Sequence, residues 1–197
     1  MTRNPMATNQ NKDENYPSYI LASCSVHIED VSQFLNELAT IGMKTGYHII
    51  LIRSSCIAGK KHIKTAITHA IRSFSTKPIA KRLEIEVLLF AAATRQTGQI
   101  HPFGVQKGEN NCCICLIPRM NELQTNPSDL IKELRINIDI DAMMKPYFAH
   151  HSVENDKTRL SFFKKHYDIT AEELAIIGEN RLEDLICERV ALLSLLK

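Results

Sequence analysis

Tryptophan is absent from this 197-residue sequence, and aromatic residues make up only 6% of it. Long apolar runs are missing as well. The longest runs from Val87 to Ala93. It falls well short of the roughly 20 apolar residues that a membrane-spanning helix needs. We therefore expect no membrane partner.

The N-terminal segment lacks the apolar core of a secretory signal. Its sequence, MTRNPMATNQNKDEN, is rich in Asn, Lys and Asp. This composition predicts a disordered tail over residues 1–16, followed by a single domain over residues 17–197. We expect a cytoplasmic protein whose six cysteines stay as thiols in a reducing compartment.

The common enzyme motifs are also missing. The sequence has no GxSxG, no HExxH and no Gly-rich phosphate loop. The segment AGKKH, beginning at Ala58, superficially resembles a Walker loop, but the pattern requires Gly where Ser54 stands and Ser or Thr where Lys61 stands. None of these motifs therefore predicts a catalytic site, and we expect no cofactor, no metal and no small-molecule substrate.

Charge is unevenly distributed, although the net charge is only +2. Residues 53–107 contain ten Lys and Arg against two Glu, which gives +8 and leaves −6 for the remainder. Such separation within one domain indicates a face for an anionic partner, although solvated helix faces could produce the same count.

Alternating helix and strand signals predict an α+β domain with a small mixed sheet and several helices. We expect strands over residues 19–27, 48–53 and 112–117. We expect helices from Asp30 to a stop at Gly42, over 59–74, over 79–97 and over 127–135. Residues 137–157 are predicted to be a strand or a loop. Thr170 and Glu173 form a capping box for a helix ending at Gly178, and Asn180 with Glu183 predicts the start of a last helix.

The two predicted helices of the basic segment each have a face that could bind a partner. The first has an apolar stripe from Ile63 to Phe74 and a polar opposite face. Lys60 and Lys61 fall in its first turn, where they oppose the helix dipole but strengthen phosphate binding by free backbone N–H groups. In the second helix Ile85, Leu89 and Ala92 form an extra apolar stripe that another element or a partner must cover.

These segments carry a family resemblance. GKKHIKTAITHAIRSF and IAKRLEIEVLLFAAATRQ, with GVQKG, CCICLI and ICERVALLSLLK downstream, are similar to the small regulatory subunit of the KEOPS tRNA-modification complex, the TPRKB-like family. The resemblance covers roughly residues 19–195. It implies an α/β fold without catalytic activity. It also implies binding of the PRPK-type atypical kinase and of the tRNA 3′ CCA end during threonylcarbamoyladenosine synthesis.

The resemblance and the charge pattern together give site predictions. Expected tRNA contacts are the basic residues of both helices and two histidines able to stack on bases: Lys60, Lys61, His62, His69, Arg72, Lys81, Arg82 and Arg95. The expected kinase interface is the extra apolar stripe and the last helix: Ile85, Leu89, Leu182, Leu185, Ile186, Arg189 and Leu193.

Two other classes remain open at this stage. One is a thiol-dependent hydrolase that uses Cys113 or Cys115 with a histidine nearby in space. The other is a stand-alone RNA-binding module with no kinase partner. Zinc binding by the cysteines is disfavoured because no CxxC pair accompanies them.

Overall fold

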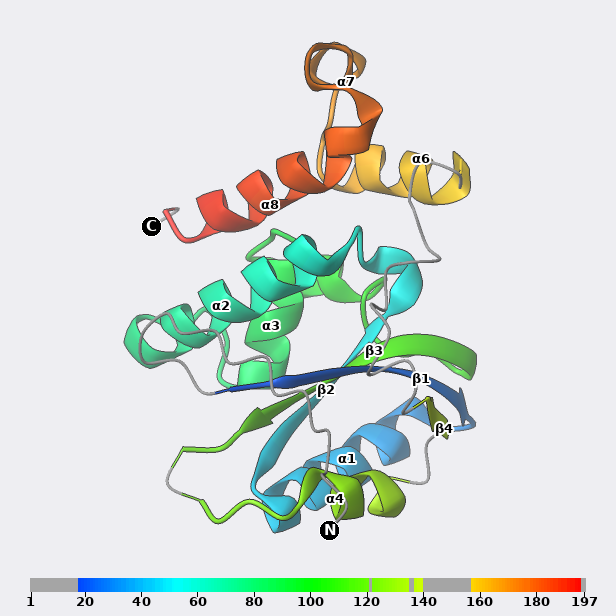
Figure 1. Ribbon diagram of the computed structural model, residues 1–197, viewed down its shortest axis with the longest axis vertical. Coiled ribbons are helices and arrows are strands. Elements are labelled where there is room, and N and C mark those ends of the chain that lie inside the picture. Colours follow the sequence, from blue (N-terminus) through cyan, green and yellow to red (C-terminus); the bar gives the residue numbers. More distant parts are fainter. Residues whose placement is uncertain (1–17, 121, 135–136, 140–156, 196–197) are drawn as a thin grey trace, which may run out of the picture.

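The computed structural model describes residues 18–120, 122–134, 137–139 and 157–195 (Figure 1). Four strands form one sheet in the order β2-β3-β1-β4. They are β1 (Ile20–Ile28), β2 (Tyr47–Arg53), β3 (Gly108–Pro118) and β4 (Asn137–Asp139). The α+β class is confirmed, and every pairing among these strands is antiparallel rather than mixed. Of the stretch from 140 to 157, expected as a strand or loop, only Lys157 lies within the described residues.

Helices cover both faces of the sheet (Figure 1). On one face lie α1 (Val31–Thr45) and α4 (Pro127–Glu133). On the other lie α2 (Lys60–Thr76) and α3 (Leu83–Ala91), and beyond them α6 (Lys157–His166), α7 (Ala171–Ile177) and α8 (Leu182–Leu193). None of the helices in the described segments is long and apolar enough to cross a membrane.

The sheet separates two apolar cores, and β3 contributes to both. Cys112, Ile114 and Leu116 pack toward α1, whereas Cys113 and Cys115 pack toward α2 and α3. This alternation follows from the two-residue period of a strand. It confirms that Cys112 faces away from the other two cysteines of this strand.

Helix α1 continues past its predicted end at Gly42. A Cβ on Gly42 would lie 2.6 Å from the carbonyl oxygen of Tyr47, so this glycine allows the helix to pack closely on β2. The helix ends instead at Gly46, whose φ of +74° is the left-handed conformation typical of a helix C-cap.

Helix α3 is shorter than predicted at both ends, because it runs from Leu83 to Ala91 and not from Ile79 to Thr97. The buried carboxylate of Glu86 accepts the backbone N–H groups of Ile79 (3.0 Å) and Ala80 (2.7 Å). These hydrogen bonds hold the backbone of Ile79 and Ala80 in a turn before the helix. Lys81 lies in that turn and Arg82 is the N-cap, so neither belongs to the first helical turn as expected.

The C-terminal helices combine confirmed and missed features. The capping box of Thr170 and Glu173 is present, and α7 ends at Gly178. Helix α8 begins at Leu182 with Arg181, not Asn180, at the N-cap. Helix α6 was not predicted, because KTRLSFFKKH has no clear apolar stripe.

Candidate nucleic-acid and kinase-binding surfaces

The outward face of α2 carries a stripe of polar side chains at four-residue spacing. Lys60 and Arg72 are exposed, while Lys64 and Thr68 between them are partly exposed. At a rise of about 1.5 Å per residue, the stripe runs for about 18 Å. It can oppose several successive phosphates. Lys64 was missing from the predicted contacts, although its spacing from Lys60 was a readable signal.

The first turn of α2 is not an open anion site, contrary to expectation. The Glu183 carboxylate, from α8, accepts the backbone N–H of His62 at 2.9 Å. Asp184 pairs with Lys61 at 3.0 Å, and this hydrogen bond raises the pKa of Lys61. Two carboxylates of the chain itself therefore occupy the position where we expected a phosphate.

His62 does not offer a stacking surface, because its ring is completely buried. Its Nδ1 accepts the backbone N–H of Ala58 (3.1 Å), and its Nε2–H donates to the carbonyl oxygen of Ala91 (2.9 Å). Burial lowers its pKa to about 4, with a smaller contribution from His166. His62 is therefore a neutral link between α2 and α3.

His69 is only partly buried, and its ring stacks on Phe90 at 6.1 Å between centroids. Its Nδ1 lies 2.7 Å from the Ser194 hydroxyl oxygen. Burial lowers its pKa, as does the charge of Arg72 to a smaller extent. One ring face is thus already covered, and its predicted RNA contact stays a prediction.

Lys81 and Arg82 are exposed at the rim of a hollow of about 370 Å³. Glu84, partly buried in the same place, is 3.3 Å from Arg82 and 2.9 Å from His48. Burial alone would favour the protonated acid, but the hydrogen bond from His48 and the charge of Arg82 lower the pKa of Glu84 to about 2. The carboxylate offsets part of the local positive charge.

Most of the predicted kinase interface lies in the protein core. Five residues are at most 8% exposed and are enclosed by α2, α3 and α8: Leu89, Leu182, Leu185, Ile186 and Leu193. A partner cannot reach them in this fold, because the apolar face of α8 covers α2 instead of remaining free.

The accessible apolar strip of α3 consists of Ile85 and Leu88, which are both partly exposed. On α8, Arg189 is partly exposed and pairs with Glu173 at 2.6 Å. Beyond it, Leu192 is 43% exposed and Leu195 is 74% exposed. Ile85 is thus the one predicted apolar residue that is accessible, whereas Leu88, Leu192 and Leu195 are neighbours of predicted residues along the helices.

The family is decided by sequence comparison over nearly the whole domain. Residues 27–194 match the profile of the family described as kinase binding protein CGI-121. The chain belongs to this family. The CGI-121 match spans both basic helices and all three C-terminal helices. A search among curated proteins finds no match.

The cysteines of this CGI-121 family member are free thiols, and those of β3 are completely enclosed. Burial raises the pKa of Cys113 to about 12 and that of Cys115 well above its ordinary value. A protonated, enclosed thiol is a poor nucleophile. Among the described residues, no three or more His, Cys, Asp or Glu form a group able to hold a metal ion.

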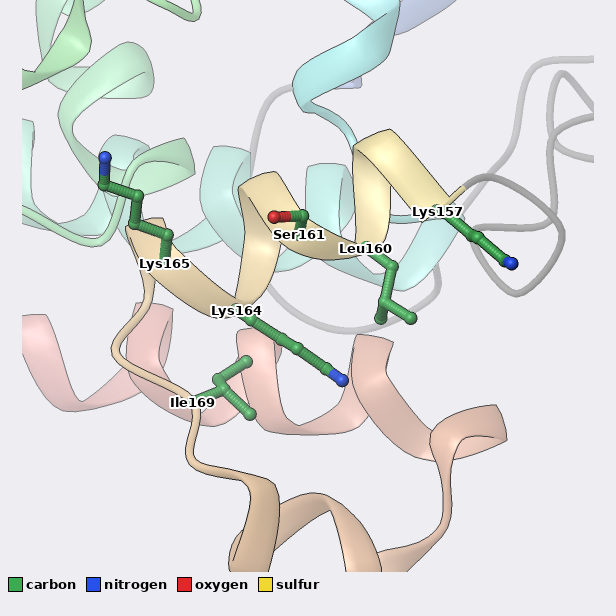
Figure 2. A pocket seen from close by; sticks show the side chains of 6 residues that line it. All are labelled: Lys157, Leu160, Ser161, Lys164, Lys165 and Ile169. Carbon is green, nitrogen blue, oxygen red and sulfur yellow. The ribbon is translucent and has the colours of Figure 1, made fainter.

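Helix α6 adds a basic surface that the sequence did not reveal. A hollow of about 500 Å³ lies against it, lined by Lys157, Leu160, Ser161, Lys164, Lys165 and Ile169 (Figure 2). Lys165 points to the opposite side of α6 from Lys164 (Figure 2).

Arg95, the last of the predicted tRNA contacts, is exposed in the segment that joins α3 to η2 (Thr97–Ile100).

Proposed function

We propose that this CGI-121 family member is a non-catalytic subunit of a KEOPS-type complex. In this role it binds the PRPK-type kinase and recruits tRNA, through the 3′ CCA end, for threonylcarbamoyladenosine modification. The α2 stripe is the observation that carries the tRNA part, because Lys60, Lys64 and Arg72 reach solvent along one helix face. Free thiols are compatible with a cytoplasmic location.

The proposed tRNA contacts are those predicted basic residues that remain at the surface. Lys60, Arg72, Lys81 and Arg95 are exposed, and Lys64 joins them. Lys61 and Arg82 are exposed too, but each has an acidic neighbour that reduces its contribution. Ammonium and guanidinium groups bind phosphate without reading sequence, so we expect affinity for tRNA that falls steeply with salt.

The proposed kinase contacts are the accessible apolar side chains next to the buried ones. Ile85 and Leu88 on α3, with Leu192 and Leu195 at the end of α8, offer side chains that a partner could cover. Leu88→Asp should abolish co-purification with the PRPK-type kinase. Leu35→Asp is the matched control, because Leu35 is 46% exposed on α1, on the opposite face of the sheet.

Two binding experiments test the proposal as a whole. The chain should co-purify with the PRPK-type kinase, and in gel-shift titrations at low salt it should bind intact tRNA more tightly than tRNA lacking CCA. Absence of tRNA binding would remove the recruitment role. Binding of tRNA without any kinase interaction would instead favour a stand-alone RNA-binding module.

A further inference from the structure

Two partly exposed aromatic rings lie next to each other on α6. Phe162 and His166 are four residues apart, which places them on one helix face. The two rings stack on each other, with centroids 5.4 Å apart and an interplanar angle of 15°. Neither ring is fully buried, in contrast to Phe163 of the same helix.

The His166 ring is held against the end of α3 by a hydrogen bond and by aromatic packing. The His166 Nε2–H donates to the carbonyl oxygen of Ala92 at 3.0 Å, and the buried ring of Phe103 lies 4.9 Å from the imidazole centroid. Because Nε2 carries the proton and burial lowers the pKa of His166, the ring is neutral and Nδ1 is an acceptor. Nδ1 has no hydrogen-bond partner in the described part of the chain.

Two exposed cations lie close along the chain to residues of this site. Lys165 is exposed directly beside His166, and Arg95 is exposed three residues after Ala92. Neither α6 nor residues 92–103 contain any Asp or Glu. Along the chain, Asp156 directly precedes α6 and Asp168 lies two residues after its end.

We infer that Phe162 and His166 form a stacking platform for an unpaired nucleobase, with Lys165 and Arg95 contacting the adjoining phosphates. Sites for single-stranded nucleic acid combine these two elements, since every base has an aromatic face and every linkage has a negative charge. An acidic peptide would use the cations but not the rings. The inference rests on the proposed function, and it assigns the unpaired 3′ end of tRNA to this platform.

A fluorescent base tests the platform without altering the protein. A tRNA with 2-aminopurine in its single-stranded 3′ end should lose fluorescence on binding the full chain, because stacking on a ring quenches the probe. The same probe in a loop at the far end of the tRNA should be unaffected. Saturated binding without quenching at the 3′ end would overturn the inference.

A pair of matched substitutions tests the residues. Phe162→Leu keeps an apolar side chain but removes the aromatic face, and base stacking is worth roughly 1–3 kcal/mol per base. Affinity for intact tRNA should therefore fall roughly 5- to 150-fold, with no change for tRNA trimmed of its single-stranded 3′ nucleotides. Phe34→Leu on α1, across the sheet, should change neither affinity.

The outcomes separate this inference from the proposed function. If the wild-type chain binds no tRNA, both fail. If it binds intact tRNA more tightly than trimmed tRNA and Phe162→Leu leaves that difference unchanged, only the platform is wrong. An equal loss for both RNAs would also reject the platform, since it would show a general effect on folding or charge. Should Phe162→Leu not fold, His166→Gln, which keeps a donor for Ala92, replaces it under the same criteria.

Discussion

The carboxylate of Glu183 accepts the backbone N–H of His62 at 2.9 Å, so a side chain of α8 caps the first turn of α2. The N-cap of α2 is Gly59, which has no side chain to perform this role. A Cβ on Gly59 would collide with the Glu183 carboxylate. Gly59 therefore lacks a capping side chain and also leaves the space that the Glu183 carboxylate, from a distant segment, occupies when it caps the helix.

Removal of this cap should destabilise the protein. Glu183→Ala is expected to lower the free energy of unfolding by about 1–2 kcal/mol, the usual cost of losing a helix N-cap. Gly59→Ala should also be destabilising, but less so when Glu183 is already Ala, because the obstructing carboxylate is gone. Urea denaturation of the two single variants and the double variant measures this coupling. Strictly additive effects would show that the two residues do not interact.

Glu86 should contribute strongly to the free energy of unfolding, because it links α2 to the segment before α3. Its buried carboxylate accepts from the Ser73 hydroxyl (2.6 Å) and from two backbone N–H groups before α3. Glu86→Ala leaves these donors without their acceptor, which should cost about 2–4 kcal/mol in thermal or chemical unfolding. Ser73→Ala, which removes one of the bonds, should cost about 1 kcal/mol. Similar losses for both variants would contradict this assignment.

His62 should make the fold sensitive to mild acid. Its pKa is about 4 in the folded protein, below the ordinary value of 6.5, chiefly because it is buried. Between these values the unfolded chain binds the proton and the folded chain does not, so stability falls as pH decreases, by up to about 1.4 kcal/mol per pH unit. Protonation of Nδ1 would also break its bond to the N–H of Ala58.

A comparison with His62→Gln isolates this contribution. We expect the variant to be less stable at pH 7 but to lose less stability between pH 6.5 and 5 than the wild type. Urea denaturation at both pH values provides the measurement. Parallel losses in the two proteins would show that other groups cause the acid sensitivity.

The α2 stripe should determine how tRNA affinity depends on salt. Each of Lys60→Gln, Lys64→Gln and Arg72→Gln should weaken binding and reduce the slope of log affinity against log salt by roughly 0.7–0.9. Lys61→Gln should have a smaller effect, because Asp184 already pairs with this side chain. Lys132→Gln on α4, on the other face of the sheet, is the control. Unchanged slopes for all stripe variants would exclude the stripe as a phosphate contact.

Local signals predicted much of the fold. Strand β2, helix α2 and the capping box of α7 depend on periodicity and caps that can be read within a short stretch, and all three are confirmed. The start of α3 could not be read in this way. It depends on Glu86 reaching back seven residues to the N–H of Ile79, and nothing in the local pattern requires this.

The surface predictions depended even more on distant contacts. His62 falls on the polar side of the first helical stripe, but Tyr167 and the end of α3 cover it. Leu89 and Leu88 are equally apolar in sequence, yet only Leu88 reaches the surface. Phe162 and His166 were missed because α6 itself was not predicted.

The long sequence separation between α2 and its cap, Glu183 on α8, affects how the chain folds during synthesis. Domains begin to fold while the ribosome is still adding residues. Until residues 182–193 have emerged, α2 has neither the Glu183 cap nor α8 to cover its apolar side. The nascent protein therefore exposes the apolar side of α2 for much of its translation. A premature stop within α8 would leave an aggregation-prone product even though all the described strands of the sheet had been made.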